Sequence, residues 1–275
     1  MGQEDWKRKP ADPEVKEAGV RLNKFLSEAG VCSRREADRL AEAGEITVDG
    51  SRAEPGTRVF PGQRVAVSGR EIAGRDRPVL LAVYKPRGVV CTTSDRDRAQ
   101  NIVEFLHYPV RIYPVGRLDK DSEGLILMTN EGELVNRILR ARYGHEKEYL
   151  VTVDRPVTEE FLARMRAGVP ILDTVTRPCT AEKTGERSFR IILTQGLNRQ
   201  IRRMCEALGW RVRSLKRIRV LNIRLGEMKA GEWREVAGAE RAELLRLLEN
   251  TDGSERAGGS TAGRTSGNEN GRRPE

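Results

Sequence analysis

The sequence predicts an α+β protein, in which a small helical unit with a hairpin precedes a larger unit built on a mixed, largely antiparallel sheet. Strand-like apolar runs and helix-like apolar stripes are mixed along the chain, which favours a sheet with helices packed on it. The 275 residues suffice for one ordinary domain and a small one, and 33% charged residues leave apolar content for two modest cores.

Composition and turn residues divide the chain into segments. Residues 73–77 are short and charged, and residues 251–275 contain no Val, Ile, Leu, Phe, Tyr or Trp, so this tail cannot fold alone. The expected segments are a flexible arm at 1–19, the small unit at 20–72, a linker at 73–77, the main domain at 78–250 and a disordered tail at 251–275.

The small unit begins with a helix and contains a hairpin. Apolar residues recur at i, i+3, i+4 and i+7, and Gly30 follows as a C-terminal cap. Residues 46–48 alternate as a strand, and Asp49-Gly50 is a typical hairpin turn. The helix stripe consists of Leu22, Phe25, Leu26 and Ala29.

A second helix begins at Ser33. Ser33 and Glu36 fit a capping box, in which the hydroxyl and the carboxylate satisfy free amides at the helix start. Arg34 and Arg35 therefore project from a helix N-terminus, whose dipole and amides already favour phosphate. The alternative is an ordinary helical pair with solvated arginines.

In the main domain the apolar runs predict a series of strands. They lie at 79–84, 112–115, 125–129, 148–153, 210–218, 220–225 and 233–236. Asn198 is expected to cap a helix that Gly209 stops, and a leucine-rich helix ends the domain. The two apolar stripes consist of Ile201, Met204, Cys205 and Leu208, and of Leu244, Leu245, Leu247 and Leu248.

One loop carries the strongest indication of chemistry. Residues 116–124 place Asp119 on a glycine-bounded loop between the apolar runs at 112–115 and 125–129. A carboxylate there is presented at the rim of a sheet. Because Asp and Gly favour turns for local reasons, the alternative is that Asp119 and Asp121 are solvated turn residues.

The basic charge is concentrated in one part of the chain. The net charge is +9, and residues 198–224 hold nine Arg or Lys against one acidic residue, Glu206. Residues 20–72 are nearly balanced in charge. A local basic surface suits a polyanion such as nucleic acid better than a scattered excess does.

Several function classes have little support. Cys32, Cys91, Cys179 and Cys205 lie far apart without a C-x-x-C pair, and only His107 and His145 are present, so we expect reduced thiols and no metal site. The first residues lack an apolar signal segment and no run of eighteen apolar residues occurs, which predicts a cytoplasmic protein without a membrane span.

Three motifs carry a family resemblance. Residues 116–130, 146–149 and 196–204 resemble the pseudouridine synthases that modify ribosomal RNA, in order and spacing as well as in sequence. The superfamily includes an A type for small-subunit rRNA, together with B, E and F types for large-subunit (23S) rRNA. The F type is the most similar, through residues 117–122, 145–149 and 195–200, and the resemblance covers about 20–249.

The resemblance implies roles for particular residues. Asp119 would be the catalytic carboxylate, Tyr149 would pack its ring on the target base with its hydroxyl near the chemistry, and Arg202 would pair with the carboxylate. An arginine suits that pairing because its planar fork stays charged and can hold a carboxylate bidentately. Lys85, in a lysine-proline-x-glycine turn, would hold the loop or reach the RNA.

The small unit resembles the alpha-L RNA-binding domain that is named after a small-subunit ribosomal protein. The resemblance rests on residues 21–24 and 33–37. The implied RNA contacts are Arg21, Lys24, Arg34, Arg35 and Arg39 in this unit, and Lys85, Arg117, Arg199 and Arg203 in the main domain.

The expected activity is the isomerisation of uridine to pseudouridine in ribosomal RNA, with no cofactor. Asp119 could attack the ribose, attack the base, or remove a sugar proton to form a glycal, and the sequence leaves these routes open. The expected partner is a structured stem-loop whose uridine is flipped out, bound by a monomer without an obligate protein partner. The alternatives are a non-catalytic RNA-binding factor, or a methyltransferase or zinc deaminase, for which no cofactor loop or H-x-E with C-x-x-C is found.

Overall fold

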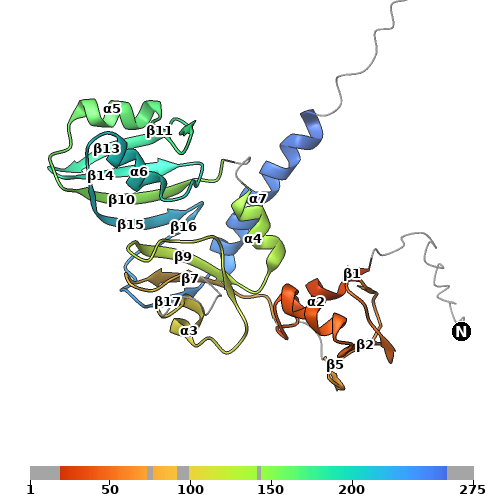
Figure 1. Ribbon diagram of the computed structural model, residues 1–275. Helices are drawn as coiled ribbons and strands as arrows, with labels where there is room; N and C mark the ends of the chain where they lie inside the picture. Colours follow the sequence, from red (N-terminus) through yellow and green to blue (C-terminus); the bar gives the residue numbers. More distant parts are fainter. Residues whose placement is uncertain (1–18, 73–76, 92–98, 141–143, 259–275) are drawn as a thin grey trace, which may run out of the picture. The chain divides into compact units, whose positions relative to one another are not determined.

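The computed structural model describes residues 19–72, 77–91, 99–140 and 144–258, with side chains described up to residue 249. The chain divides into two compact units, Met1–Arg77 and Pro78–Glu275 (Figure 1). The arm expected at 1–19 and the linker expected at 73–77 lie almost entirely outside the described residues.

The first unit packs two helices on short strands. Its helices are α1 (Leu22–Glu28) and α2 (Arg34–Glu42), and β1 (Val20–Arg21) pairs with β4 (Arg58–Val59). A four-stranded sheet has the order β3-β2-β5-β6, with bounds Ser51–Arg52, Ile46–Val48, Val65–Val67 and Arg70–Glu71. Asp49 and Gly50 have φ angles of 49° and 81°, as a tight hairpin turn requires. The stripe residues Leu22 and Leu26 are buried in the unit's apolar core.

The second unit is built on a nine-stranded sheet (Figure 1). Its main path is β13-β14-β10-β15-β9-β7-β17, while β8 pairs with β9 and β16 pairs with β15. The pairing is antiparallel except between β15 and β9, so the sheet is mixed and largely antiparallel as predicted. In chain order the bounds are β7 (Leu80–Lys85), β8 (Tyr113–Pro114), β9 (Glu123–Thr129), β10 (Lys147–Val153), β13 (Thr180–Gly185), β14 (Ser188–Leu193), β15 (Val212–Val220), β16 (Ile223–Arg224) and β17 (Trp233–Glu235). A separate two-stranded ribbon joins β11 (Pro170–Ile171) and β12 (Thr174–Val175).

Helices cover both faces of this sheet. α5 (Glu159–Ala167) and α6 (Gln200–Ala207) share an apolar core with β10 and β14. The strand β7 sends alternate residues to two further cores, one with α4 (Gly132–Leu139) and α7 (Gly238–Gly258), the other with α3 (Ile102–Leu106). This alternation is why the central strands β7 and β9 are continuously apolar in sequence.

Some element boundaries differ from the sequence-based expectations. The strands expected at 210–218 and 220–225 are one long strand, β15, and the short β16, because the chain reverses at Leu221 with φ 52° and not at residue 219. The helix expected to be capped by Asn198 has Arg199 at its N-cap in a left-handed conformation, with no side-chain cap hydrogen bond. Helix α7 runs to Gly258, so the first residues of the expected tail continue a helix that is already formed, which costs little once a helix is nucleated.

Candidate functional site

The site is built on the loop between β8 and β9, which presents Asp119. Leu118 is buried in the core that contains Ile126, and Ser122 N donates to Asp119 O at 3.0 Å, so the loop is held on both sides of the carboxylate. At the loop's end Gly124 has φ 104°, and a Cβ there would lie 2.2 Å from Arg217 O on β15. Only glycine allows this approach, by which the parallel pairing of β9 with β15 fixes the loop.

Two arginines from the start of α6 face Asp119. Its Oδ2 lies 3.7 Å from Arg199 Nη1 and 3.9 Å from Arg202 Nε, and the carboxylate side chain is 30% exposed. Arg202 also donates through Nη2 to Asp121 O and Ser122 Oγ, both at 3.1 Å. The expected bidentate grip on Asp119 is therefore not what the structure shows. Arg202 holds the loop through its Nη2 and approaches the Asp119 carboxylate with its Nε.

Asp119 opens onto a pocket of about 430 Å³, a size typical of small-ligand sites. Tyr149 on β10 lines the same pocket and packs against the two cores that meet beneath it. Apolar side chains and the segment before α6 complete the lining, including Leu118, Leu193, Ile201, Leu215, and residues 194–200. The expected trio of Asp119, Tyr149 and Arg202 is thus brought together, with Arg202 behind the carboxylate.

Two cations that were not predicted as site residues also line the pocket. Lys147 lies two residues before Tyr149 on β10, and Arg217 is the β15 residue opposite Tyr149. Burial, and then the positive charge of Arg217, lower the pKa of Lys147 to about 8. Both could have been found in the sequence. Lys147 shares a strand face with Tyr149, and Arg217 shares one with the apolar Leu215.

The position of Lys85 differs from that of an RNA contact. Its side chain is fully buried, and its Nζ donates to Pro86 O and Val89 O, both at 2.8 Å. Burial lowers its pKa. The ammonium holds the turn after β7 and offers no donor to RNA in this conformation, so the loop-holding alternative is the one that the geometry favours.

The remaining candidates in the main domain have differing contacts. Arg117 is exposed and lines the pocket. Arg199, which is expected to contact RNA, also lines the pocket and pairs with Asp119. Arg203 donates through Nε to Asn198 O at 3.1 Å, so it holds the loop that precedes α6.

In the first unit the expected phosphate contacts fall into two groups. Arg21, Arg34 and Arg35 are exposed. Lys24 Nζ lies 3.7 Å from Glu28 Oε1, and Arg39 pairs with Glu36. The Ser33 hydroxyl accepts from Glu36 N at 3.1 Å as the capping box predicts, whereas the Glu36 carboxylate contacts Arg39. Arg39 is also exposed but pairs with an acidic side chain, so the helix start with Arg34 and Arg35 is the basic surface that the geometry favours for phosphate.

Known families match both units. The RNA pseudouridylate synthase family matches residues 79–207, and the S4 domain family matches residues 20–65. A crystal structure of a pseudouridylate synthase shares 26% identity, covers 83% of this chain and 99% of that chain, and superimposes with a TM-score of 0.60.

Curated relatives give the same result. The dual-specificity RNA pseudouridine synthase RluF of Escherichia coli strain K12 is 52% identical over 86% of this chain and 81% of the relative. The ribosomal large subunit pseudouridine synthase B of Bacillus subtilis strain 168 is 34% identical over 83% of this chain and 97% of the relative. The chain belongs to the RNA pseudouridylate synthase family. It is an RNA pseudouridine synthase with an N-terminal S4 domain, which confirms the predicted fold and enzyme class.

Proposed function

We propose that this enzyme isomerises a uridine in large-subunit (23S) ribosomal RNA, with Asp119 as the catalytic carboxylate. The observation that carries the proposal is the placement of Asp119 at a pocket that Tyr149 shares, with two guanidinium groups 3.7 and 3.9 Å from its Oδ2. Each of the chemical routes uses an anionic oxygen of this carboxylate, and the two guanidinium groups complement its charge.

Asp119 acts on a uridine that has left its stack. The reaction breaks the bond between ribose C1′ and base N1, joins C1′ to base C5, and moves one proton from C5 to N1. Asp119 attacks the ribose, attacks the base, or removes a sugar proton, and it is recovered at the end of each route. The target atoms of a stacked uridine are inaccessible, so the nucleotide is flipped into the pocket.

Tyr149 and Arg202 support this chemistry in different ways. The Tyr149 ring, on the wall of the pocket, provides a surface on which the flipped uracil stacks. Arg202 is a positioning residue, because it bonds to Asp121 O and Ser122 Oγ while it faces Asp119. A carboxylate held in this way needs no reorganisation when the substrate arrives.

The RNA itself is held by exposed cations. Arg117 and Arg199, which line the pocket, contact phosphates near the flipped nucleotide, and Arg34 and Arg35, which are exposed in the S4 domain, contact phosphates elsewhere on the same RNA. The substrate is a structured stem-loop. We also expect the enzyme to act in the cytoplasm, as a monomer without an obligate protein partner. Asp119, Tyr149 and Arg202 come together within a single unit of the chain, which supports catalysis without a residue from a second subunit. No helix within the described ranges is long and apolar enough to cross a membrane.

The test is a pseudouridine map of ribosomal RNA from cells with and without this protein, read by carbodiimide primer-extension stops. We expect one 23S position to lose its stop in the deletion strain, to regain it with the wild-type gene, and not with Asp119→Asn. The map includes the other RNA classes of the cell as well as 23S RNA, since the Escherichia coli relative is called dual-specificity. An unchanged map of 23S RNA would contradict the proposed substrate.

A further inference from the structure

Lys147 and Arg217 form a cationic wall in the pocket that no carboxylate of the described residues neutralises. Arg217 is only 4% exposed, and its Nε donates to Leu125 O at 2.7 Å, while its buried Nη2 has no hydrogen-bond partner. Lys147 is half-buried and its Nζ donates to His145 O at 3.3 Å, which leaves further donor hydrogens. Throughout the described part of the chain, neither cation has a carboxylate within ion-pair distance.

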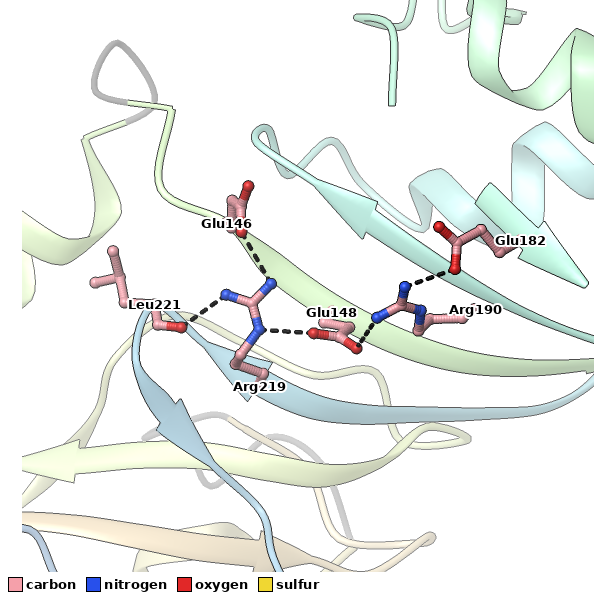
Figure 2. Close-up of polar contacts among 6 residues, drawn as sticks. All are labelled: Glu146, Glu148, Glu182, Arg190, Arg219 and Leu221. Carbon is pink, nitrogen blue, oxygen red and sulfur yellow. Dashed lines mark hydrogen bonds and ion pairs between the residues drawn. The ribbon is translucent and has the colours of Figure 1, made fainter. Parts of the chain in front are cut away.

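The reverse face of the same strands is arranged in the opposite way (Figure 2). There Glu148 accepts from Arg219 Nε at 2.6 Å and from Arg190 Nη1 at 3.1 Å. Arg219 also donates to Glu146 Oε2 at 2.9 Å, and Arg190 to Glu182 Oε2 at 2.6 Å. Each arginine on this face therefore has carboxylate partners, although these side chains are more accessible than Arg217.

A β-bulge separates the two kinds of arginine. Glu148 pairs with Arg219 and Tyr149 pairs with Arg217, so the register skips Ile218. In a regular strand Arg217 and Arg219, two residues apart, would face the same side. The extra residue turns Arg219 to the carboxylates behind the sheet and leaves Arg217 beside Tyr149 in the pocket. Bulges commonly re-aim side chains in this way next to active sites.

A desolvated cation without an anionic partner is costly, so the persistence of two such cations in the pocket indicates a ligand that carries negative charge. The proposed reaction produces such a ligand. When N1 separates from C1′, the bonding electrons stay on the uracil and spread onto its O2 and O4 carbonyl oxygens. Attack on the base at C6 also delivers an electron pair to O4. Negative charge therefore develops on the uracil oxygens whichever route Asp119 follows.

We propose that Lys147 and Arg217 bind the carbonyl oxygens of the flipped uracil and stabilise the negative charge that develops on the base as the glycosidic bond breaks. This inference rests on the proposed function of Asp119. The ammonium and the guanidinium keep their protons throughout, and the electron pair returns to the new bond between C5 and C1′. Donors aimed at developing charge in a desolvated site are among the strongest contributions to catalysis.

The protonation state of Lys147 distinguishes this role from that of a general base. With a pKa of about 8, Lys147 loses its charge in mildly alkaline solution. A charge-stabilising lysine then gives a rate that falls above that pH, whereas a proton-accepting lysine gives a rate that rises. Besides Tyr149 and Arg217, the charged or titratable side chains that line the pocket are Arg117 and Asp119 from the loop before β9, Arg140 after α4, His145 before β10 and Arg199 before α6.

The experiment compares Lys147→Gln, Lys147→Arg and the wild type as full-length proteins on a uridine-containing 23S fragment. Single-turnover rates are measured at saturating and at limiting RNA between pH 6.5 and 9.5. Lys216→Gln is the matched control, because Lys216 precedes Arg217 on β15 but lies over the Tyr84 ring outside the pocket. Thermal unfolding of each variant checks that it is folded.

We expect Lys147→Gln to lower the saturated rate by about 10²-fold, with RNA affinity changed by less than about threefold. Lys147→Arg should restore most of the rate and remove the decline above pH 8 that the wild type shows at limiting RNA. Lys216→Gln should match the wild type. A saturated rate unaffected by Lys147→Gln, or a wild-type rate that rises through pH 8, would overturn the inference. A wild type that makes no pseudouridine would instead count against the proposed function.

Discussion

The two units of this enzyme use arginine in contrasting environments. In the S4 domain Arg34 and Arg35 are exposed at the start of α2, where the helix amides favour phosphate. In the catalytic domain Arg202 is only 14% exposed, and it donates through Nη2 to a backbone carbonyl and a hydroxyl while its Nε faces Asp119. The contrast indicates that the exposed arginines contribute RNA affinity, whereas the half-buried arginine beside a carboxylate fixes the position of that carboxylate.

The largest effect should come from the carboxylate itself. Asp119→Asn keeps the shape of the side chain but removes the anionic oxygen, so we expect a loss of turnover on the order of 10⁴-fold or more with RNA binding retained. Single-turnover pseudouridine formation and a binding titration measure the two quantities. Asp121→Asn is the control, since only its backbone carbonyl contacts Arg202, and it should be much milder. Activity of Asp119→Asn within tenfold of wild type would refute the assignment.

Tyr149→Phe tests the hydroxyl separately from the ring. Stacking on the base should persist, while proton transfer from C5 should slow by about 10²-fold if the hydroxyl takes part. Release of tritium from C5 of labelled uridine, followed in a single turnover, reports this step. Equal rates for the two proteins would show that only the ring matters.

Arg202→Lys should lower the saturated rate by about 10²-fold, although the charge is kept. Arg202 bonds Asp121 O and Ser122 Oγ through Nη2 while its Nε faces Asp119, and the single nitrogen of an ammonium cannot occupy both places. Small displacements of a catalytic group are costly. Arg203→Lys is the matched control, because the Arg203 side chain on the same helix bonds to Asn198 in the loop before α6 and, among the described residues, makes no hydrogen bond to the loop of Asp119. Equal losses in the two variants would mean that the helix start, and not the carboxylate, is what Arg202 supports.

The smallest effect on chemistry should follow from the S4 domain. Replacing Arg34 and Arg35 together by Ala should weaken binding and reduce the slope of log K against log salt by up to about 0.9 per lost contact on a duplex, or about 0.7 on single strands. The saturated rate should stay within about twofold of wild type. A binding titration at several salt concentrations checks the slope.

Local patterns in the sequence predicted the elements that depend on local chemistry. The Asp49-Gly50 turn, the Ser33 cap and the apolar strands around Asp119 follow from turn geometry and periodicity. The bulge opposite Tyr149 could not be predicted, because it depends on which β15 residue is left unpaired between two neighbouring strands. The burial of Lys85 was missed for a similar reason, since its partners are carbonyls that only the folded turn brings together.

The sequence predicted which residues form the site but not how their side chains contact one another. The motif resemblance indicated Asp119, Tyr149 and Arg202. The way in which Arg202 holds the loop depends on Ser122, and nothing in the sequence around Ser122 predicts that contact. Lys147 was within a quoted motif and could have been inferred from its strand face. Its lowered pKa results from burial and from Arg217 on another strand, which no local pattern reveals.

The most direct test of this division of labour measures RNA affinity and saturated rate on the same RNA for Asp119→Asn and for the Arg34→Ala, Arg35→Ala double variant. We expect the first to lose rate and keep affinity, and the second to lose affinity with a shallower salt dependence and keep its rate. A double variant whose salt dependence is unchanged while its saturated rate collapses would contradict this division, because these arginines would then organise the active site.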